Sequence, residues 1–103
     1  MNYQEVIKAC NECISAANQC LSQHMGEEDM KTCHLLCLDC ISVCTACVQM
    51  LARDSAYVGQ ITGICAELCL ACADECGKFD SDACKQCAEA CRRCAEACKN
   101  IAA

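Results

Sequence analysis

The sequence predicts an all-α fold, an antiparallel up-down-up-down four-helix bundle with a cysteine-lined core, from three observations. Apolar residues recur with helical periodicity along nearly all of the 103 residues. Glycines and acidic residues interrupt this pattern and divide it into four segments. All 17 cysteines fall on the a or d positions of heptads laid over these segments. Short connections make neighbouring helices antiparallel, and the length suits one domain, residues 1–103.

The first helix is expected from about Gln4 to His24. Gly26 follows it as a residue that can stop a helix. Three acidic residues, 27–29, then crowd the start of the second helix, where the helix dipole favours negative charge. The second helix should continue to about Arg53.

The third and fourth helices are delimited by polar residues and a glycine. Asp54 or Ser55 is expected to cap the third helix, because short polar side chains accept hydrogen bonds from the free amides of a first turn. Gly77 should end the third helix, and Asp80 or Ser81 should cap the fourth, which runs almost to the end of the chain.

The cysteines follow the spacing at which a coiled helix normally places leucines. Between Cys33 and Cys47 five cysteines occupy fifteen residues at steps of 4, 3, 4 and 3. On the first helix Ala17 fills a gap in the same phase. The predicted core ligands are Cys10, Cys13, Cys20, Cys33, Cys37, Cys40, Cys44, Cys47, Cys65, Cys69, Cys72, Cys76, Cys84, Cys87, Cys91, Cys94 and Cys98.

The ends of the seams differ in chemistry, which gives the predicted bundle a direction. With antiparallel helices, one end gathers an apolar plug of Tyr3, Val6, Leu51, Val58 and Ile101. The opposite end, which we call the mouth, gathers His24, Met25, Met30 and His34. Imidazole and thioether groups can both bind soft metal ions, so His24, Met30 and His34 are candidate entry-site ligands. A solvated or capping histidine and a gap-filling core methionine are the ordinary alternatives.

The charge and the cysteine count limit the possible partners and compartments. A formal net charge of -6 without a basic stripe argues against a nucleic-acid partner. The start, MNYQEVIKAC, lacks the basic and apolar regions of an export signal, so we expect a cytoplasmic protein whose thiols stay reduced. Seventeen is an odd number, so disulfides within one chain could not use every cysteine.

The apolar second helix is about as long as a membrane span, which needs roughly 20 residues. It contains His34, Asp39, Ser42 and Gln49, and no aromatic belt or flanking basic cluster supports insertion. We therefore expect no membrane partner.

Seventeen seam cysteines favour metal binding over simple packing. Cysteine can serve as a small hydrophobe, but alanine, valine or leucine would pack as well without the risk of oxidation. Soft thiolates select Cu(I), zinc or iron–sulfur clusters. Zinc knuckles and iron–sulfur motifs usually lie on turns or loops, whereas these cysteines lie within predicted helices.

Cu(I) is the predicted ion, on both geometry and charge. Residues at i,i+3 or i,i+4 have Cβ atoms about 5–6 Å apart, and a sulfur–metal–sulfur bridge spans about 4.5 Å if each bond is near 2.3 Å. Neighbouring cysteines on one helix could therefore share an ion. One monovalent ion per thiolate would also leave the core close to neutral, so we expect about one Cu(I) per cysteine.

Two other functions remain open on the residues alone. One is a metallothionein-like buffer for zinc or other soft metals, which should stop near one zinc per four thiols. The other is a redox or peroxide-scavenging protein with an activated thiol. Many near-equivalent buried cysteines and no visible substrate pocket argue against an enzyme.

The CxxC and CxxxC repeats, ending in CGKFDSDACKQCAEACRRCAEAC (residues 76–98), resemble the bacterial cytosolic copper storage proteins. The resemblance covers essentially the whole chain. It implies a four-helix bundle that stores many Cu(I) ions on its core cysteines and assembles as a homotetramer. It also implies that metal enters at an end bearing ligands other than cysteine. Relatives often carry histidines before the fourth helix, where this chain has Phe79, Ser81 and Ala83.

The second helix gives its own support for an oligomer. Its residues outside the cysteine seam are apolar on nearly every side: Leu35, Leu36, Leu38, Ile41, Val43 and Val48. A helix that is apolar all round is normally buried all round, whereas one side would face water in a monomer. We therefore expect a homo-oligomer.

Overall fold

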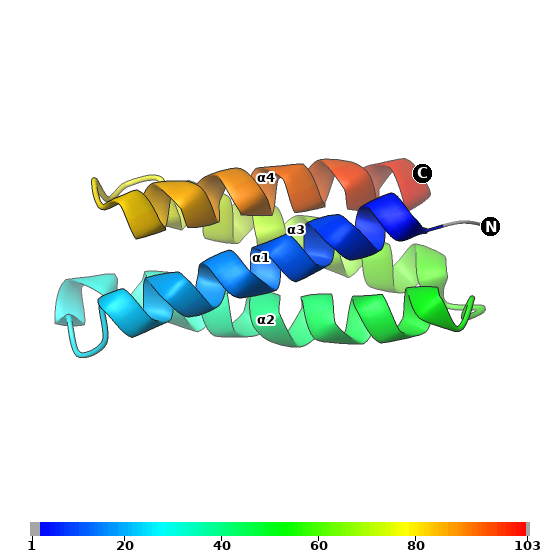
Figure 1. Cartoon of the computed structure of the whole chain (residues 1–103), viewed down its shortest axis with the longest axis horizontal. Helices are drawn as coiled ribbons and strands as arrows, with labels where there is room; N and C mark the ends of the chain where they lie inside the picture. The colour runs from blue at the N-terminus through cyan, green and yellow to red at the C-terminus, as the bar shows by residue number, and fades with distance from the viewer. Residues whose placement is uncertain (1–2, 103) are drawn as a thin grey trace.

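The computed structural model describes residues 3–102 and consists of four long α-helices joined by short connections (Figure 1). The helices are α1 (Gln4–Gln23), α2 (Lys31–Ala52), α3 (Val58–Cys76) and α4 (Asp82–Ala102). A 3₁₀ turn, η1 (Glu28–Met30), leads into α2. The described residues contain no strand. The predicted all-α bundle is confirmed.

The four helices form a ring of antiparallel neighbours. Helix α1 packs against α2 and α4, and α3 packs against the same two helices. The bundle measures 41 × 18 × 18 Å. The two ends of the chain lie at the same end of it (Figure 1). A bundle this narrow has room for one central column of side chains.

The turn between α1 and α2 depends on Gly26. Helix α1 ends at Gln23, and Gly26 has φ +87°, a left-handed conformation that side chains rarely adopt. A Cβ at this position would meet no atom within 4 Å. The glycine is therefore needed for its backbone conformation and not for close packing.

The predicted start of the third helix was wrong. Asp54 has φ 53° and ends α2, with its N–H donating to the Leu51 carbonyl and the Ser55 N–H donating to the Met50 carbonyl. This is the hydrogen-bond pattern that closes many helices, with aspartate in the place of the usual glycine. Helix α3 begins only at Val58, without a side-chain cap.

Of the two residues predicted to cap α4, Asp80 and Ser81, it is Ser81 that does so. The Ser81 hydroxyl accepts a hydrogen bond from the Cys84 N–H at 3.1 Å, as a capping serine does. Gly77 follows the last residue of α3, as expected. A Cβ on Gly77 would lie 3.0 Å from the Ala73 carbonyl oxygen and 3.3 Å from Arg92 of α4. The glycine thus avoids a clash with the last turn of α3 and leaves room for the Arg92 side chain of α4.

The predicted apolar plug is present at one end of the bundle. Val6, Leu51 and Val58 are buried, and Tyr3 and Ile101 pack against them in part. Thr62 is also fully buried, and its hydroxyl donates to the Val58 carbonyl at 2.7 Å. Because this hydrogen bond lies within α3, the buried hydroxyl needs no partner from another helix.

Helix α2 leaves apolar side chains in contact with solvent. Leu35 is 55% exposed and Leu38 is 50% exposed, and Ile64 on α3 is 50% exposed. The stretch Glu28–Ala52 is also long and apolar enough to cross a membrane, and 33% of its most apolar window is buried in the bundle. Its buried side is the cysteine seam, which forms one wall of the core.

Candidate metal centre

The thiol core contains all seventeen cysteines of the chain. Each is 0% exposed, and none forms a disulfide. Every helix contributes, because the heptad pattern turns each a and d position towards the bundle axis. The prediction that all cysteines face the core is confirmed, and the result is a continuous column of sulfur.

The sulfur atoms approach one another mainly across helices. In three cases, two cysteines one turn apart in the same helix have their sulfur atoms within 4.0 Å of each other, as Cys65 and Cys69 do. Most of the close pairs join different helices, as Cys13 and Cys91 do at 3.5 Å. The sequence had suggested ions shared down a single helix. The structure shows that the helix-to-helix pairs matter more, because all four seams point at one axis.

The thiols gather into groups in which all sulfurs lie within 4.8 Å of one another. Five of these groups hold four cysteines each, and some of them share two members, such as Cys10 and Cys65 or Cys37 and Cys76. They are Cys10, Cys47, Cys65 and Cys98; Cys10, Cys44, Cys65 and Cys94; Cys13, Cys44, Cys69 and Cys94; Cys20, Cys33, Cys37 and Cys76; and Cys37, Cys72, Cys76 and Cys87. Shared members allow one sulfur to bridge two ions.

Burial raises the pKa of two thiols near the mouth, Cys20 and Cys33. Burial, and then the neighbouring Cys76, raises the pKa of Cys20 from 9.0 to about 12. Burial likewise raises the pKa of Cys33, whose sulfur lies 2.9 Å from that of Cys76. A metal ion that binds these thiols at neutral pH must therefore displace protons.

Deeper in the column, ionisation of one thiol opposes ionisation of the next. Hydrogen bonds from the surrounding thiols, Cys40 foremost, lower the pKa of Cys13. The hydrogen bond with Cys13 is the largest cause that raises the pKa of Cys69. A single thiolate is thus stabilised by neutral neighbours, and further thiolates need positive charge beside them.

A hydrogen-bonded chain of three side chains lies at the mouth. His24 Nε2 lies 2.8 Å from Ser81 Oγ, and His24 Nδ1 pairs with the Glu27 carboxylate. The chain ties the α1–α2 turn to the start of α4. The position of His24 on the heptad seam had made it a candidate. Its contact with Ser81, 57 residues away, could not be predicted from the sequence.

The other mouth candidates have different surroundings. Met30 is 3% exposed and packs into the core, whereas Met25 is 81% exposed. His34 lines a surface hollow of about 420 Å³ with Gly26, Glu27, Glu28, Lys31 and Leu35. The Nε2 atom of His34 is buried and has no hydrogen-bond partner. Of these three residues, Met25 is the most exposed to solvent.

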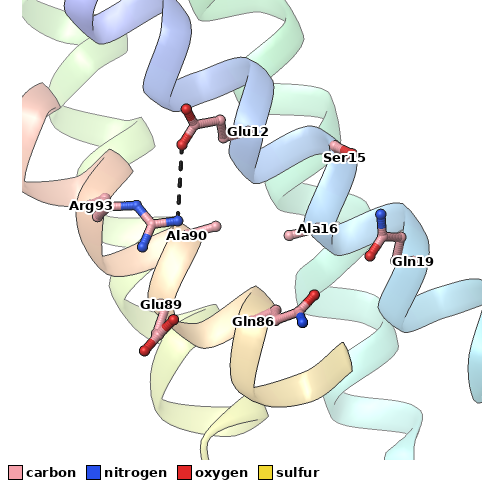
Figure 2. Close-up of a pocket in the computed structure, with 8 residues that line it drawn as sticks. All are labelled: Glu12, Ser15, Ala16, Gln19, Gln86, Glu89, Ala90 and Arg93. Atoms are coloured by element: carbon pink, nitrogen blue, oxygen red, sulfur yellow. Dashed lines mark ion pairs between the residues drawn. The ribbon is translucent and has the colours of Figure 1, made fainter. Parts of the chain in front are cut away.

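A shallow groove between α1 and α4 lies outside the thiol core. It has a volume of about 310 Å³ and is lined by Glu12, Ser15, Ala16, Gln19, Gln86, Glu89, Ala90 and Arg93 (Figure 2). Arg93 reaches across it to Glu12 at 3.9 Å, and Glu89 points away from α1 (Figure 2). Arg93 is 59% exposed. No cysteine lines this groove, so the metal chemistry belongs to the core.

The fold and the core together define a four-helix-bundle protein that binds many thiophilic metal ions between its helices. The model of the copper storage protein family matches residues 1–103, and the chain belongs to this family. Its function is copper storage, and Cu(I) is the ion that suits its thiols.

Solved structures of the family agree with this assignment. Metal-free copper storage protein 3 from Bacillus subtilis is 37% identical, with a TM-score of 0.94 over 99% of this chain and 100% of that one. A Cu(I)-bound copper storage protein is 38% identical, with a TM-score of 0.93 over the same shares. A cytosolic copper storage protein from Streptomyces lividans, solved with five coppers, is 32% identical, with a TM-score of 0.91 over 97% and 91%.

One curated relative is similar in sequence. It is an uncharacterized cysteine-rich protein, YhjQ, of Bacillus subtilis strain 168, with 38% identity over 66 residues. The alignment spans 61% of this chain and 61% of that relative.

Proposed function

We propose that this protein stores Cu(I) on all seventeen core cysteines, with about one ion per thiol at saturation. The observation that carries this proposal is the complete burial of every cysteine in one column. A protein that needed only a few metal ions would not require so many equivalent ligands. Soft thiolates are the ligands that Cu(I) prefers.

The sulfur spacing suits bridging ions. Close pairs such as Cys44 and Cys65 lie 3.6 Å apart. A near-linear sulfur–metal–sulfur bridge spans about 4.5 Å, and rotation about χ1 moves a sulfur by more than the difference. Copper therefore fits between existing neighbours after small side-chain adjustments.

Charge balance also favours Cu(I). Seventeen unpaired thiolates in a low-dielectric core would be prohibitively costly. One monovalent ion per thiolate makes the column neutral. A zinc ion held by four thiolates instead leaves two negative charges, so a core filled with such sites would contain several buried dianions.

Zinc buffering is the second candidate, and the structure gives it one supporting observation. Sulfurs of a tetrahedral zinc–thiolate site lie about 3.8 Å apart, which is close to the spacing in the four-cysteine groups. The placement of cysteines on helices is therefore no argument against zinc, contrary to the expectation from sequence. The stoichiometry and the charge still favour copper.

Titration of the reduced protein with Cu(I) in the presence of a competing chelator tests the proposal. We expect binding of close to seventeen ions, followed by native mass spectrometry of the loaded protein. A parallel titration with zinc should stop near four ions, and added Cu(I) should displace them. Saturation with one or two coppers would overturn storage.

The compartment and the absence of catalysis are part of the same proposal. Free thiols persist in the reducing cytosol, and the Streptomyces relative is described as cytosolic. The acidic chain, with a net charge of -6, is expected to bind neither nucleic acid nor membrane. The buried thiols offer no accessible nucleophile, so we propose no enzyme activity.

Entry and assembly complete the proposal. We place copper entry at the mouth, with His24, Met30 and His34 as the candidate ligands. Met30 packs into the thiol core, and His34 lines the hollow beside it. We also propose a homotetramer, supported by the exposed Leu35, Leu38 and Ile64. Sedimentation equilibrium should show a tetramer for the native chain and smaller species for Leu38→Glu. A monomeric native chain would contradict the assembly and leave storage intact.

A further inference from the structure

His24 lies directly beyond the last cysteine of α1. It follows Cys20 by four residues, and its N–H donates to the Cys20 carbonyl at 3.2 Å, so the two side chains lie one helical turn apart on the same face. The Cys20 sulfur lies 3.7 Å from that of Cys84, the first cysteine of α4. The His24 side chain is 17% exposed. The imidazole is thus partly open to solvent and lies one turn from a thiol of the core.

Glu27 determines which ring nitrogen of His24 carries the hydrogen. The Glu27 N–H donates to the His24 carbonyl at 3.1 Å, so the turn itself holds the carboxylate beside the ring. The carboxylate oxygen Oε2 contacts Nδ1 of the ring, and an ionised carboxylate can only accept hydrogen bonds. Nδ1 must therefore carry the hydrogen and donate it. In the neutral imidazole the free lone pair is then on Nε2.

The hydroxyl of Ser81 occupies this lone pair in the metal-free chain. Ser81 Oγ lies 2.8 Å from His24 Nε2 and accepts a hydrogen bond from the Cys84 N–H at 3.1 Å. Because the oxygen accepts from the backbone, its own hydrogen is available to be donated to the neutral imidazole. The hydroxyl thus holds the one nitrogen through which the neutral His24 ring can bind a metal ion.

We propose that Glu27 positions His24 to bind incoming copper through Nε2, and that Ser81 holds this nitrogen until copper replaces it. This inference rests on the entry of copper at the mouth, proposed above. A histidine that binds a metal ion commonly donates its other ring N–H to a carboxylate, which fixes the ring and makes the free nitrogen a stronger ligand. Glu27 provides this carboxylate before any metal has arrived.

Copper binding at Nε2 exchanges one partner of the ring for another. The hydrogen bond from the Ser81 hydroxyl breaks, the bond between Nε2 and copper forms, and no proton leaves the protein in this step. The Ser81 oxygen keeps its hydrogen bond from the Cys84 N–H, so α4 stays capped. The ion now lies one turn from Cys20 and can pass to the core thiols, each of which releases its proton to water when it binds. The hydroxyl then returns to the ring.

The tautomer of His24 in the reduced, metal-free protein is the first test, and it needs no copper. At mildly alkaline pH, where imidazole is neutral, ¹⁵N NMR of labelled histidine should show the His24 hydrogen on Nδ1. In Glu27→Ala both tautomers should be present. Asp29→Ala is the matched control, because it removes the same charge from the same turn, and within residues 3–102 Asp29 forms no ion pair with His24. It should keep the hydrogen on Nδ1.

Stopped-flow transfer of Cu(I) from a chromophoric chelator is the second test. Glu27→Ala should slow loading by about tenfold, the lower end of the usual effect of losing such a carboxylate on metal binding. Ser81→Ala should load faster than the native chain, because nothing then competes for Nε2, and Ser81→Thr should restore the native rate. The gain from Ser81→Ala should vanish in a His24→Ala background. A mouth that was merely loosened would load faster in both backgrounds.

The outcomes separate this inference from the proposed entry at the mouth. Hydrogen on Nε2 in the native chain, or a tautomer unchanged by Glu27→Ala, would overturn the role of Glu27. Faster loading of Ser81→Ala with and without His24 would overturn the role of Ser81. Slow loading of His24→Ala would leave entry through His24 standing in both cases, whereas a native rate for His24→Ala would overturn that entry itself. The Glu27 side chain is 51% exposed, so its replacement leaves the core intact.

Discussion

His24 and Ser81, 57 residues apart, meet at 2.8 Å and join the turn after α1 to the first turn of α4. The Ser81 oxygen has a second partner, because it also accepts a hydrogen bond from the Cys84 N–H. One hydroxyl thus caps α4 through the backbone of a core cysteine and also holds a histidine.

Replacing Ser81 with alanine should destabilise the metal-free protein by about 1 kcal/mol, which is typical for the loss of an N-cap. Urea unfolding of the reduced protein measures the change. Ser15→Ala is the control, because Ser15 is exposed within α1 and caps nothing. Equal unfolding midpoints for the two variants would contradict the role of Ser81.

His24→Ala should slow copper loading without changing the final number of ions. Imidazole is a copper ligand, and His24 is 17% exposed at the end of the sulfur column. Stopped-flow transfer of Cu(I) from a chromophoric chelator gives the rate. The loading rate of His34→Ala, at the other histidine of the mouth, is measured in the same way for comparison. A loading rate for His24→Ala equal to that of the native chain would remove His24 from the entry path.

The metal-free protein should lose stability above pH 9. Burial raises the pKa of Cys20 from its ordinary 9.0 to about 12 in the folded chain, so the unfolded chain ionises first as the pH increases. The stability contributed by keeping this thiol protonated is present below pH 9 and is lost between pH 9 and about 12. Cys33 acts in the same direction, since burial raises its pKa as well.

Urea unfolding midpoints of reduced protein at pH 8 and pH 10 check this expectation. The midpoint should be lower at pH 10. A higher midpoint would show that thiols with lowered pKa values, such as Cys13, dominate the proton balance.

Leu51→Ala should cost about 2–5 kcal/mol of unfolding free energy, the usual range for a buried leucine. Leu51 is 2% exposed in the apolar plug and contributes no ligand. The copper capacity should therefore stay unchanged once the protein is folded. Chemical unfolding gives the first quantity and native mass spectrometry the second. A reduced capacity would show that the plug shapes the metal sites.

The helices and the cysteine core could be predicted from the sequence, because each helix shows the heptad pattern on its own. Val6, Leu51 and Val58 could be placed together from antiparallel topology alone. The start of α3 could not, since Asp54 adopts a left-handed conformation that favours glycine but that aspartate tolerates. A capping aspartate and a helix-ending aspartate look the same in the sequence.

The contacts between helices were the main part that the sequence could not supply. Pairs such as Cys13 and Cys91 depend on how far each helix slides along its neighbour, and heptads alone leave this register open. The meeting of His24 and Ser81 depends on the same register. For this reason the sequence suggested ions held along one helix, whereas the structure gathers sulfurs from several.

The narrowness of the bundle, 41 Å long and 18 Å wide, has a consequence for the order in which cargo leaves. If copper enters and leaves by the mouth, as proposed, the plug blocks the far end, and an ion near Leu51 departs after those nearer His24. The protein would then work as a stack, in which the last ion to arrive is the first to be handed on.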